Sequence, residues 1–539
     1  MVRWRLAAVV VVVTAGLAVV GPVGPSVGAG GEPERTVRTT SGLVRGVLDG
    51  QVRRFFGVPY AAPPVGELRW RAPRPVRPWS GVRDAGEPAL PCRQAPGDIQ
   101  DSSEDCLYLN VTVPRHRSGP KPVMVWVHGG GNFGGTGNEV DPRRMVTAGD
   151  VVVVTVNYRL GVFGFFGHPE LADSGSFGLL DQQAALRWVR DNAAAFGGDP
   201  RNVTLFGESA GGIDTCAHLT SPRAAGLFDK VMLQSGSCSF PGWTIGPGFT
   251  TPVAGPRSYW PSRQDVVAAG AAAATELGCP AGPGALRCLR ALPAEALLGR
   301  MIEFGAPASG TATLPLDPRD AVAAGRFHPV PILTGHTRDE ARFVTAWSEL
   351  PDQPITEQRF HTLTEQAFGA HARQVRQRYP LTDYDSPALA WATLDTDRSM
   401  ACPQLRDAHT FGARTPTYAY EFADRTAPPY APLPPGSMPD GAGHAAELTY
   451  LFDIAGKPID WNGNRVPHTA PQRALAAIMI GYWTRFALTG DPNGHAPHWA
   501  PVDPHAPRSQ EFRTGAGGIA PVNAADAHHC AFWDAIDDW

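Results

Sequence analysis

The stretch Phe206-Gly207-Glu208-Ser209-Ala210-Gly211-Gly212 decides the fold class. It follows a short apolar run, Val203–Phe206, and sequence compatible with a helix resumes after Gly212. Gly-x-Ser-x-Gly between a strand and a helix predicts a nucleophile elbow, a sharp turn that exposes the serine hydroxyl at the end of a sheet. Because strand and helix pass very close together there, the two glycines must lack side chains. We therefore predict that Ser209 is a nucleophile in an α/β protein.

The sequence around this turn alternates between short apolar runs and helical spacing. The expected buried strands are Leu107–Val113, Val123–Val127, Val151–Val156, Val203–Phe206 and Val330–Gly335. Helices are expected at Phe177–Asn192 and Gly278–Leu298, and a small antiparallel sheet within Val44–Pro59. Alternation of this kind predicts a large, mostly parallel sheet flanked by helices. Since no linker-like segment interrupts the pattern, we expect one catalytic domain, residues 30–539.

Residues 1–29 resemble an export signal, with a basic start, an apolar run of about 15 residues and a small-residue cleavage site. The run is too short to span a bilayer, so we expect a secreted mature chain with no integral membrane segment. Eight cysteines suit disulfides in an oxidising compartment. A composition with 43% apolar and 18% charged residues indicates a globular protein, and a net charge of −4 gives no basic field for nucleic acid.

A glycine-rich loop follows the expected strand Val123–Val127. His128-Gly129-Gly130-Gly131 lies where esterases place the loop whose N–H groups bind the oxyanion of the tetrahedral intermediate. Glycines allow backbone N–H groups to approach a substrate without a Cβ in the way. We assign the donors to Gly130, Gly131 and Ala210.

A serine nucleophile at neutral pH needs a base and an acid that orients the base. In this fold the acid and then the histidine follow the serine along the chain. Of sixteen histidines, His444 lies in the small-residue segment Gly441–Glu447. Asp339 and Glu340 follow the expected strand Val330–Gly335, and the residues alone do not choose between these two acids.

Several longer motifs carry a family resemblance. They are Phe196–Gly211, Glu104–Val111, Phe56–Gly66, Asn157–Gly161 and Asp181–Asn192. Together they resemble the type-B carboxylesterase family, which includes cholinesterases and bacterial carboxylesterases, from Gly42 to Trp533. The resemblance implies that Glu340 is the acid and His444 the base. It also implies that Glu447 and Ser235 are residues behind the triad that orient it.

The resemblance further implies three disulfides, Cys92–Cys106, Cys279–Cys288 and Cys402–Cys530. Cys216 and Cys238 remain and are paired with each other, with two free thiols as the alternative. In two places the chain departs from its relatives. The loop between Cys92 and Cys106 has no aromatic residue for a choline cation, which argues against a cholinesterase. Asn132 replaces a large aromatic residue after the three glycines, which suggests a more open or more polar acyl pocket.

The expected activity is two-step hydrolysis of a carboxylic ester through an acyl-enzyme, with a small-molecule or lipid-like ester as substrate. We expect no metal and no organic cofactor, because His528, His529 and Cys530 fit a disulfide end better than a metal site. Activity should fall as the pH drops through the titration of His444 at about 6–7. The alternatives are an interfacial lipase and a non-catalytic adhesion module, and a monomer is the favoured state.

Overall fold

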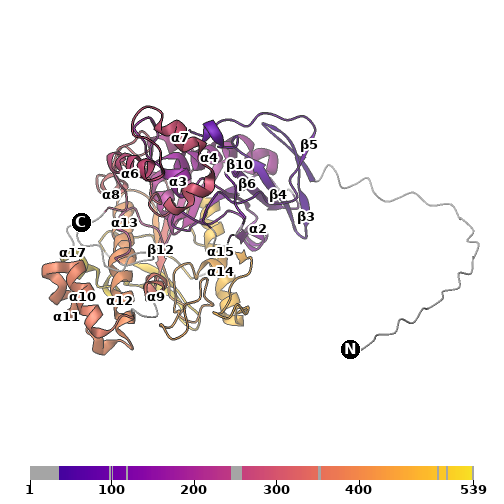
Figure 1. Cartoon of the computed structure of the whole chain (residues 1–539). Coiled ribbons are helices and arrows are strands. Elements are labelled where there is room, and N and C mark those ends of the chain that lie inside the picture. Colours follow the sequence, from indigo (N-terminus) through magenta and orange to yellow (C-terminus); the bar gives the residue numbers. More distant parts are fainter. Residues whose placement is uncertain are drawn as a thin grey trace, which may run out of the picture.

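The computed structural model describes residues 35–95, 99, 101–116, 119–244, 258–349, 354–494, 497–505 and 508–536. The expected export signal, residues 1–29, lies outside the described residues. So do residues 245–257. Within the described part, the chain is built around one large twisted sheet with helices on both of its faces (Figure 1).

The large sheet runs from the N-terminal to the C-terminal part of the chain. Its strands, in spatial order, are β16 (Ile519–Val522), β15 (Ser509–Phe512), β13 (Thr417–Phe422), β12 (Ile332–Thr337), β11 (Lys230–Gln234), β10 (Gly198–Glu208), β7 (Lys121–Val127), β9 (Val152–Val156), β6 (Tyr108–Pro114), β4 (Val52–Pro59) and β3 (Val47–Asp49). The seven neighbours from β15 to β9 are parallel, and both edges are antiparallel. Since the carboxyl ends of parallel strands lie at one edge, the loops after β7, β10, β11 and β12 can meet there.

The N-terminal region differs from the expectation of a small sheet within Val44–Pro59. A small sheet exists, but it consists of β1 (Thr36–Thr39), β2 (Gly42–Arg45) and β5 (Val82–Asp84). Strand β4 instead pairs with β6 and extends the large sheet. The local alternation indicated strands correctly but carried no information about their partners. A third pairing joins β8 (Val140–Asp141) to β14 (Asp453–Ile454).

Helices on both faces bury the large sheet. Those described are α2 (Arg143–Gly149), α3 (Gly161–Phe165), α4 (Phe177–Phe196), α5 (Ala210–Thr220), α6 (Arg263–Glu276), α7 (Ala285–Ala291), α8 (Pro318–Ala323), α9 (Arg342–Ser348), α10 (Glu357–Phe368), α11 (Ala372–Arg378), α12 (Pro387–Asp395), α13 (Cys402–Gly412), α14 (Leu448–Leu451), α15 (Ala470–Thr489), α16 (Ala524–Ala527) and α17 (Cys530–Ile536). Residues of α4 and α5 belong to one large apolar cluster, and those of α2, α14 and α15 to another. A third cluster contains residues of α10, α11, α12, α13 and α17.

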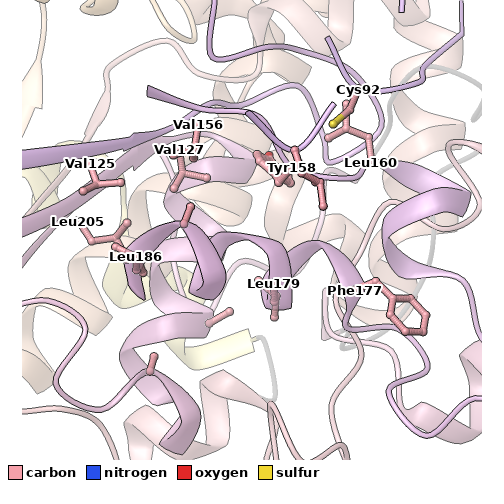
Figure 2. Close-up of a cluster of buried hydrophobic side chains, with 14 of the residues drawn as sticks. Cys92, Val125, Val127, Val156, Tyr158, Leu160, Phe177, Leu179, Leu186 and Leu205 are labelled. Carbon is pink, nitrogen blue, oxygen red and sulfur yellow. The ribbon is translucent and has the colours of Figure 1, made fainter. Parts of the chain in front are cut away.

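Strand β7 shows why these sequences form a two-sided sheet. Val125 and Val127 point into the cluster with α4 (Figure 2), whereas Met124 and Trp126 point into the cluster with α15. Alternate side chains of a strand face opposite sides. Each buried valine stabilises the fold by roughly 1.5–3 kcal/mol through the removal of apolar surface from water. A continuous apolar run is therefore the pattern of a strand covered on both faces.

The segment Gly278–Leu298 is less helical than expected. It contains only α7 and a 3-10 turn from Ala294 to Arg300. Gly282 and Gly284 adopt left-handed φ values of 95° and 103°, and Pro293 follows the helix. These residues interrupt helical hydrogen bonding, so the alanine-rich composition was misleading there.

Candidate active site

Ser209 occupies the turn between β10 and α5. Its backbone has φ 56° and ψ −124°, a strained conformation for a residue with a side chain. Its N–H donates to the carbonyl of Gln234, at 3.0 Å, and thereby helps to hold the turn. A Cβ on Gly207 would lie 2.5 Å from the carbonyl carbon of Gly211, and one on Gly211 would lie 2.1 Å from the carbonyl oxygen of Val127. The two flanking glycines are therefore a packing requirement of the elbow.

The imidazole of His444 binds the carboxylate of Glu340. Its Nδ1–H donates to Oε2 of Glu340 at 2.5 Å, and the N–H of Thr337 donates to Oε1 at 2.8 Å. The Glu340 side chain is fully buried. Burial alone would raise its pKa, but the charge of His444 and the hydrogen bonds from His444 and Thr337 hold the pKa below its ordinary value. Glu340 is thus kept as a carboxylate that orients the ring.

The neighbouring acid, Asp339, has other partners. Its oxygens accept hydrogen bonds from the guanidinium groups of Arg342, at 2.8 Å, and Arg425, at 2.9 Å. The N–H of Ala442 also donates to it, at 2.9 Å. Of the two acids that the residues alone left open, the structure brings Glu340 to His444 and directs Asp339 to these arginines.

The second nitrogen of His444 is directed at the elbow. Its Nε2 lies 3.2 Å from Oε1 of Glu208, the residue immediately before Ser209. Within the described part of the chain, no hydrogen bond joins the Ser209 hydroxyl to His444. Catalytic hydrogen bonds are often long or misaligned before substrate binds.

Three buried carboxyl groups surround this one imidazole. They belong to Glu208, Glu340 and Glu447, and the Nε2–H of Gln234 donates to Oε1 of Glu447 at 3.2 Å. Burial raises the pKa of Glu208 well above its ordinary value and raises that of Glu447 to about 7. Burial alone would lower the pKa of His444, but the charges of Glu208 and Glu340 raise it to about 9. This value lies above the 6–7 expected from the sequence, because the sequence did not reveal the cluster.

Two residues that we had proposed to orient the triad lie next to it. Glu447 belongs to the carboxyl cluster and is fully buried. Ser235 is also fully buried, directly follows β11 with φ 45°, and donates its N–H to the carbonyl of Gly335 at 2.8 Å.

Sequence reasoning missed Glu208, Phe343 and the position of Trp243. The ring of Phe343 stacks on His444 at 4.7 Å between centroids, and Trp243 meets the same imidazole edge-on at 6.2 Å. Glu208 could have been found from its fixed place beside the serine. No local pattern identifies Phe343, since only the fold brings it to His444.

The glycine loop after β7 lies against the elbow. A Cβ on Gly129 would be 3.1 Å from Cβ of Ser209. Gly130 and Gly131 have φ values of 97° and 62°, and the carbonyl of Gly130 accepts the N–H groups of the residues three and four positions later. Among the described residues, no hydrogen bond uses the N–H groups of Gly130, Gly131 or Ala210. The expectation that these N–H groups bind a developing oxyanion stays a prediction.

Comparison with known proteins places the chain in a family. The sequence model of the carboxylesterase family matches residues 33–533. The chain belongs to the carboxylesterase family. It is 35% identical to a fumonisin B1 esterase of Sphingopyxis macrogoltabida, over 92% of this chain and 90% of that protein. It is 34% identical to a para-nitrobenzyl esterase of Bacillus subtilis (strain 168), over 86% and 91%.

Solved structures agree with this assignment. A PNB esterase superposes on this carboxylesterase with a TM-score of 0.75 at 31% identity, covering 93% of this chain and 100% of the other. A thermophilic PNB esterase gives a TM-score of 0.76 at 30% identity. The predicted family and the α/β-hydrolase fold are confirmed, and the protein is a carboxylic ester hydrolase.

The side chain of Asn132 in this carboxylesterase is fully buried and contacts Asp214 and Tyr158, at 3.0 and 3.1 Å. Its expected effect on an acyl pocket stays a prediction. The next residue, Phe133, is 37% exposed, and a Cβ on Gly131 would lie 2.3 Å from its ring. The aromatic side chain beside the glycines is therefore shifted by one position in the sequence.

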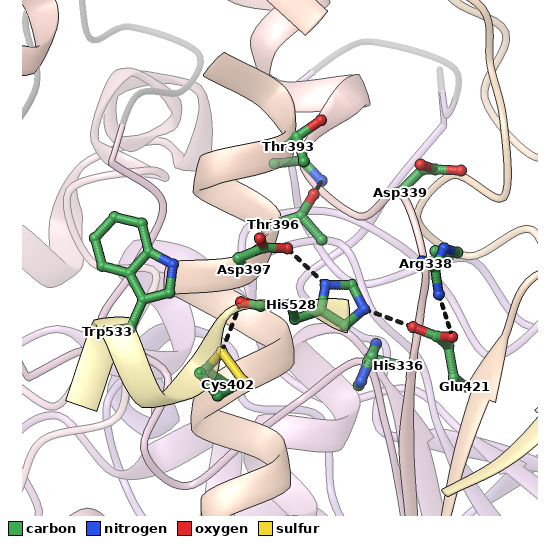
Figure 3. Close-up of polar contacts among 12 residues, drawn as sticks. His336, Arg338, Asp339, Thr393, Thr396, Asp397, Cys402, Glu421, His528 and Trp533 are labelled. Carbon is green, nitrogen blue, oxygen red and sulfur yellow. Dashed lines mark hydrogen bonds and ion pairs between the residues drawn. A yellow bond between two sulfur atoms is a disulfide. The ribbon is translucent and has the colours of Figure 1, made fainter. Parts of the chain in front are cut away.

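A second buried cluster lies away from the elbow, between β13 and the C-terminal helices (Figure 3). The ring nitrogens of His528 lie 2.5 Å from Oδ1 of Asp397 and 2.5 Å from Oε1 of Glu421. Burial alone would lower the pKa of His528, but the two carboxylates raise it to about 10. Ligand atoms of His336, Glu421 and His528 lie within 4.8 Å of one another. Because both nitrogens of His528 already donate to carboxylates, the cluster is an ion-paired imidazolium in this structure, and we assign it no metal.

All eight cysteines lie in disulfides. The pairs are Cys92–Cys106, Cys216–Cys238, Cys279–Cys288 and Cys402–Cys530, the same pairs that we had expected. The last pair joins α13 to α17. Among the described helices, none has both the length and the apolarity to cross a membrane.

Proposed function

We propose that this carboxylesterase cleaves its ester through an acyl-enzyme on Ser209, with His444 as general base and Glu340 as the carboxylate that orients it. The supporting observation is the position of His444. One nitrogen donates to Glu340 at 2.5 Å, and the other is directed at Glu208, next to the serine. Acyl transfer requires an acid that orients the base and a base that can take the proton of the nucleophile, and the bond between His444 and Glu340 supports the first of these requirements.

The proposed reaction has two matching halves. Neutral His444 takes the proton of Ser209 while the serine oxygen bonds to the ester carbonyl carbon. The oxyanion accepts hydrogen bonds from the N–H groups of Gly130, Gly131 and Ala210, at the N-terminus of α5. The imidazolium then gives its proton to the departing alcohol. Water then gives a proton to His444 as it attacks the acyl carbon, and the imidazolium returns a proton to the Ser209 oxygen as the acyl bond breaks, which releases the acid, free Ser209 and neutral His444.

The substrate class follows from the surface near the reacting groups. Phe133 and Trp243 offer apolar contact area beside the glycine loop and the imidazole. We therefore propose an uncharged ester with an apolar or aromatic portion. Related esterases are named for para-nitrobenzyl and fumonisin B1 esters. Export through residues 1–29, with residues 30–539 as a single monomeric domain, is also proposed. The four disulfides suit an oxidising compartment.

A fluorophosphonate probe tests the nucleophile. Wild-type enzyme should take up one probe per chain at Ser209, identified by peptide mass spectrometry, and lose activity in parallel. Ser209→Ala should neither label nor turn over p-nitrophenyl acetate, while its thermal unfolding stays close to that of wild type. Labelling at another serine, or substantial turnover by Ser209→Ala, would refute the proposal. Faster turnover of long-chain esters above their solubility limit would instead identify an interfacial lipase.

A further inference from the structure

Asp214 is a buried acid on α5, five residues after the proposed nucleophile, and the mechanism above does not use it. Its Oδ1 accepts a hydrogen bond from Nδ2 of Asn132 at 3.0 Å, and its Oδ2 accepts one from Nε2 of Gln182 at 2.5 Å. Among the described residues it has no ion-pair partner. Burying an unpaired carboxyl group is costly. The groups that surround Asp214 should therefore show what this buried carboxyl group does.

Two side-chain amide groups face Asp214. Nε2 of Gln182 is directed at it, and Oε1 of Gln182 lies 2.7 Å from Nε2 of His218. Nδ2 of Asn132 is also directed at it, and Oδ1 of Asn132 lies 3.1 Å from the hydroxyl of Tyr158. Both carboxyl oxygens are thus met by donors.

The partner of Asp214 is the residue that ends the glycine loop. Glycines have no side chains with which to anchor themselves, so a loop of three depends on its two ends. At the start, the hydroxyl of Tyr158 contacts the carbonyl of His128 at 2.9 Å. At the end, Asn132 has a left-handed φ of 60°, a conformation that asparagine tolerates better than most residues. Its side chain contacts Asp214 at 3.0 Å and Tyr158 at 3.1 Å, and the hydroxyl of Tyr259 also interacts with it.

Asp214 therefore connects the two parts of the proposed oxyanion hole. Helix α5 supplies Ser209 and the N–H of Ala210, whereas the glycine loop supplies the N–H groups of Gly130 and Gly131. We infer that Asp214 is a positioning residue that fixes the glycine loop relative to α5 through the side chain of Asn132, so that the three N–H groups converge on one oxygen. This inference rests on the proposed function.

The titratable groups that face Asp214 fit this positioning role. Burial raises the pKa of Asp214 to about 7, while Gln182 and Asn132 oppose the rise. The hydroxyls of Tyr158 and Tyr259 are buried nearby, and burial together with the charge of Asp214 raises both of their pKa values. His218, reached through Gln182, stays neutral because burial lowers its pKa to about 3. No group around Asp214 carries a positive charge that could hold the loop in place of Asn132.

An exchange of the two side chains is the sharpest test. In Asp214→Asn the new amide faces the NH₂ group of Asn132 or of Gln182, so one anchor is lost. In Asn132→Asp two carboxyl groups face each other. In the double variant the amide at 214 donates to the acid at 132 and accepts from Gln182, while the acid at 132 accepts from Tyr158. The double variant therefore restores these hydrogen bonds, with the acid and the amide exchanged between positions 132 and 214.

We expect each single variant to lower kcat for p-nitrophenyl acetate ten- to hundredfold with KM within threefold, since a displaced donor weakens transition-state binding. The double variant should recover kcat to within about fivefold of wild type. Asn132→Gly, which keeps the backbone conformation but removes the anchor, should lose kcat as well. Gln183→Met is the control, because Gln183 contacts His218 and Ser221 and not Asn132.

Two outcomes overturn the inference. One is a kcat of Asp214→Asn within twofold of wild type, and the other is a folded double variant as slow as the single ones. Thermal melting identifies variants that fail to fold. If neither Asp214→Asn nor Asn132→Asp folds, Asn132→Gly is used instead, and a kcat within twofold of wild type then overturns the inference. Fluorophosphonate labelling separates the two proposals. A wild type that does not label at Ser209 refutes the proposed function, whereas normal labelling with unchanged turnover in Asp214→Asn refutes only the role of Asp214.

Discussion

His444 lies between Glu340 and Glu208, with one ring nitrogen 2.5 Å from the first carboxylate and the other 3.2 Å from the second. The two contacts have different consequences. The bond to Glu340 sets the orientation and tautomer of the ring. The contact with Glu208 holds the nitrogen that must serve Ser209, and it stabilises the protonated ring, which is inactive as a base.

The first contact predicts a ranking of two neighbouring variants. Glu340→Gln removes the charge that orients and stabilises the imidazolium, so kcat/KM should fall roughly a hundred- to ten-thousandfold. Asp339→Asn should instead mainly cost stability, about 1–3 kcal/mol, because Arg342 and Arg425 lose their carboxylate. Steady-state kinetics and urea unfolding of both variants check this. The reverse ranking in kcat/KM would move the acid to Asp339.

The second contact predicts the pH profile. A base must be neutral, so kcat/KM should rise as the pH increases through the pKa of His444, which is raised to about 9. Glu208→Gln removes the largest of the charges that raise this pKa and should shift the acidic limb to lower pH by about one unit. Glu447→Gln removes a weaker contribution and should shift the limb less. If Glu208→Gln leaves the limb unchanged, the contact does not control the base.

The local parts of the site could be predicted from the sequence. The elbow and the glycine loop are contiguous motifs whose residue types follow from steric and hydrogen-bonding needs at one turn. Ser209 and Gly130 are therefore recognisable without knowledge of the fold. The choice between Asp339 and Glu340 was not local, since both follow the same strand and only their side-chain directions differ.

Contacts between distant segments could not be predicted. The hydrogen bond between Asn132 and Asp214 joins residues 82 positions apart. Apolar periodicity reports which residues are buried, but not which buried polar groups meet. The same holds for β4, whose alternation predicted a strand but not its place in the large sheet.

Removal of a disulfide should cost more stability when the enclosed segment of chain is longer, with a logarithmic dependence on its length. Cys402 and Cys530 are 128 positions apart, and Cys279 and Cys288 only 9. On the chain-entropy model the double alanine variants should lose about 5 and about 2.6 kcal/mol. Denaturant unfolding under non-reducing conditions measures both. Equal losses would mean that native packing, rather than chain entropy, dominates.

The ion pairs of His528 predict a pH dependence of stability that is separate from that of activity. The pKa of His528 is about 10 in the folded protein and about 6.5 in the unfolded chain. The contribution of protonated His528 to the stability of the folded protein is therefore complete below pH 6.5 and is lost as the pH rises toward 10. The pKa of Glu421 is lowered to about 2, because His528 and Arg338 oppose the effect of burial, so its stabilisation is present above about pH 4.3 and is lost toward pH 2.

His528→Gln tests this dependence. Between pH 7 and 9 the free energy of unfolding of wild type should fall by up to about 1.4 kcal/mol per pH unit more steeply than that of the variant, because only wild type keeps the extra proton when folded. His529→Gln, at the neighbouring and partly exposed position, should keep the wild-type slope. Urea unfolding at several pH values gives the slopes. Parallel slopes for wild type and His528→Gln would show that His528 is not a buried cation, and the ion-paired interpretation of its contacts with Asp397 and Glu421 would then be wrong.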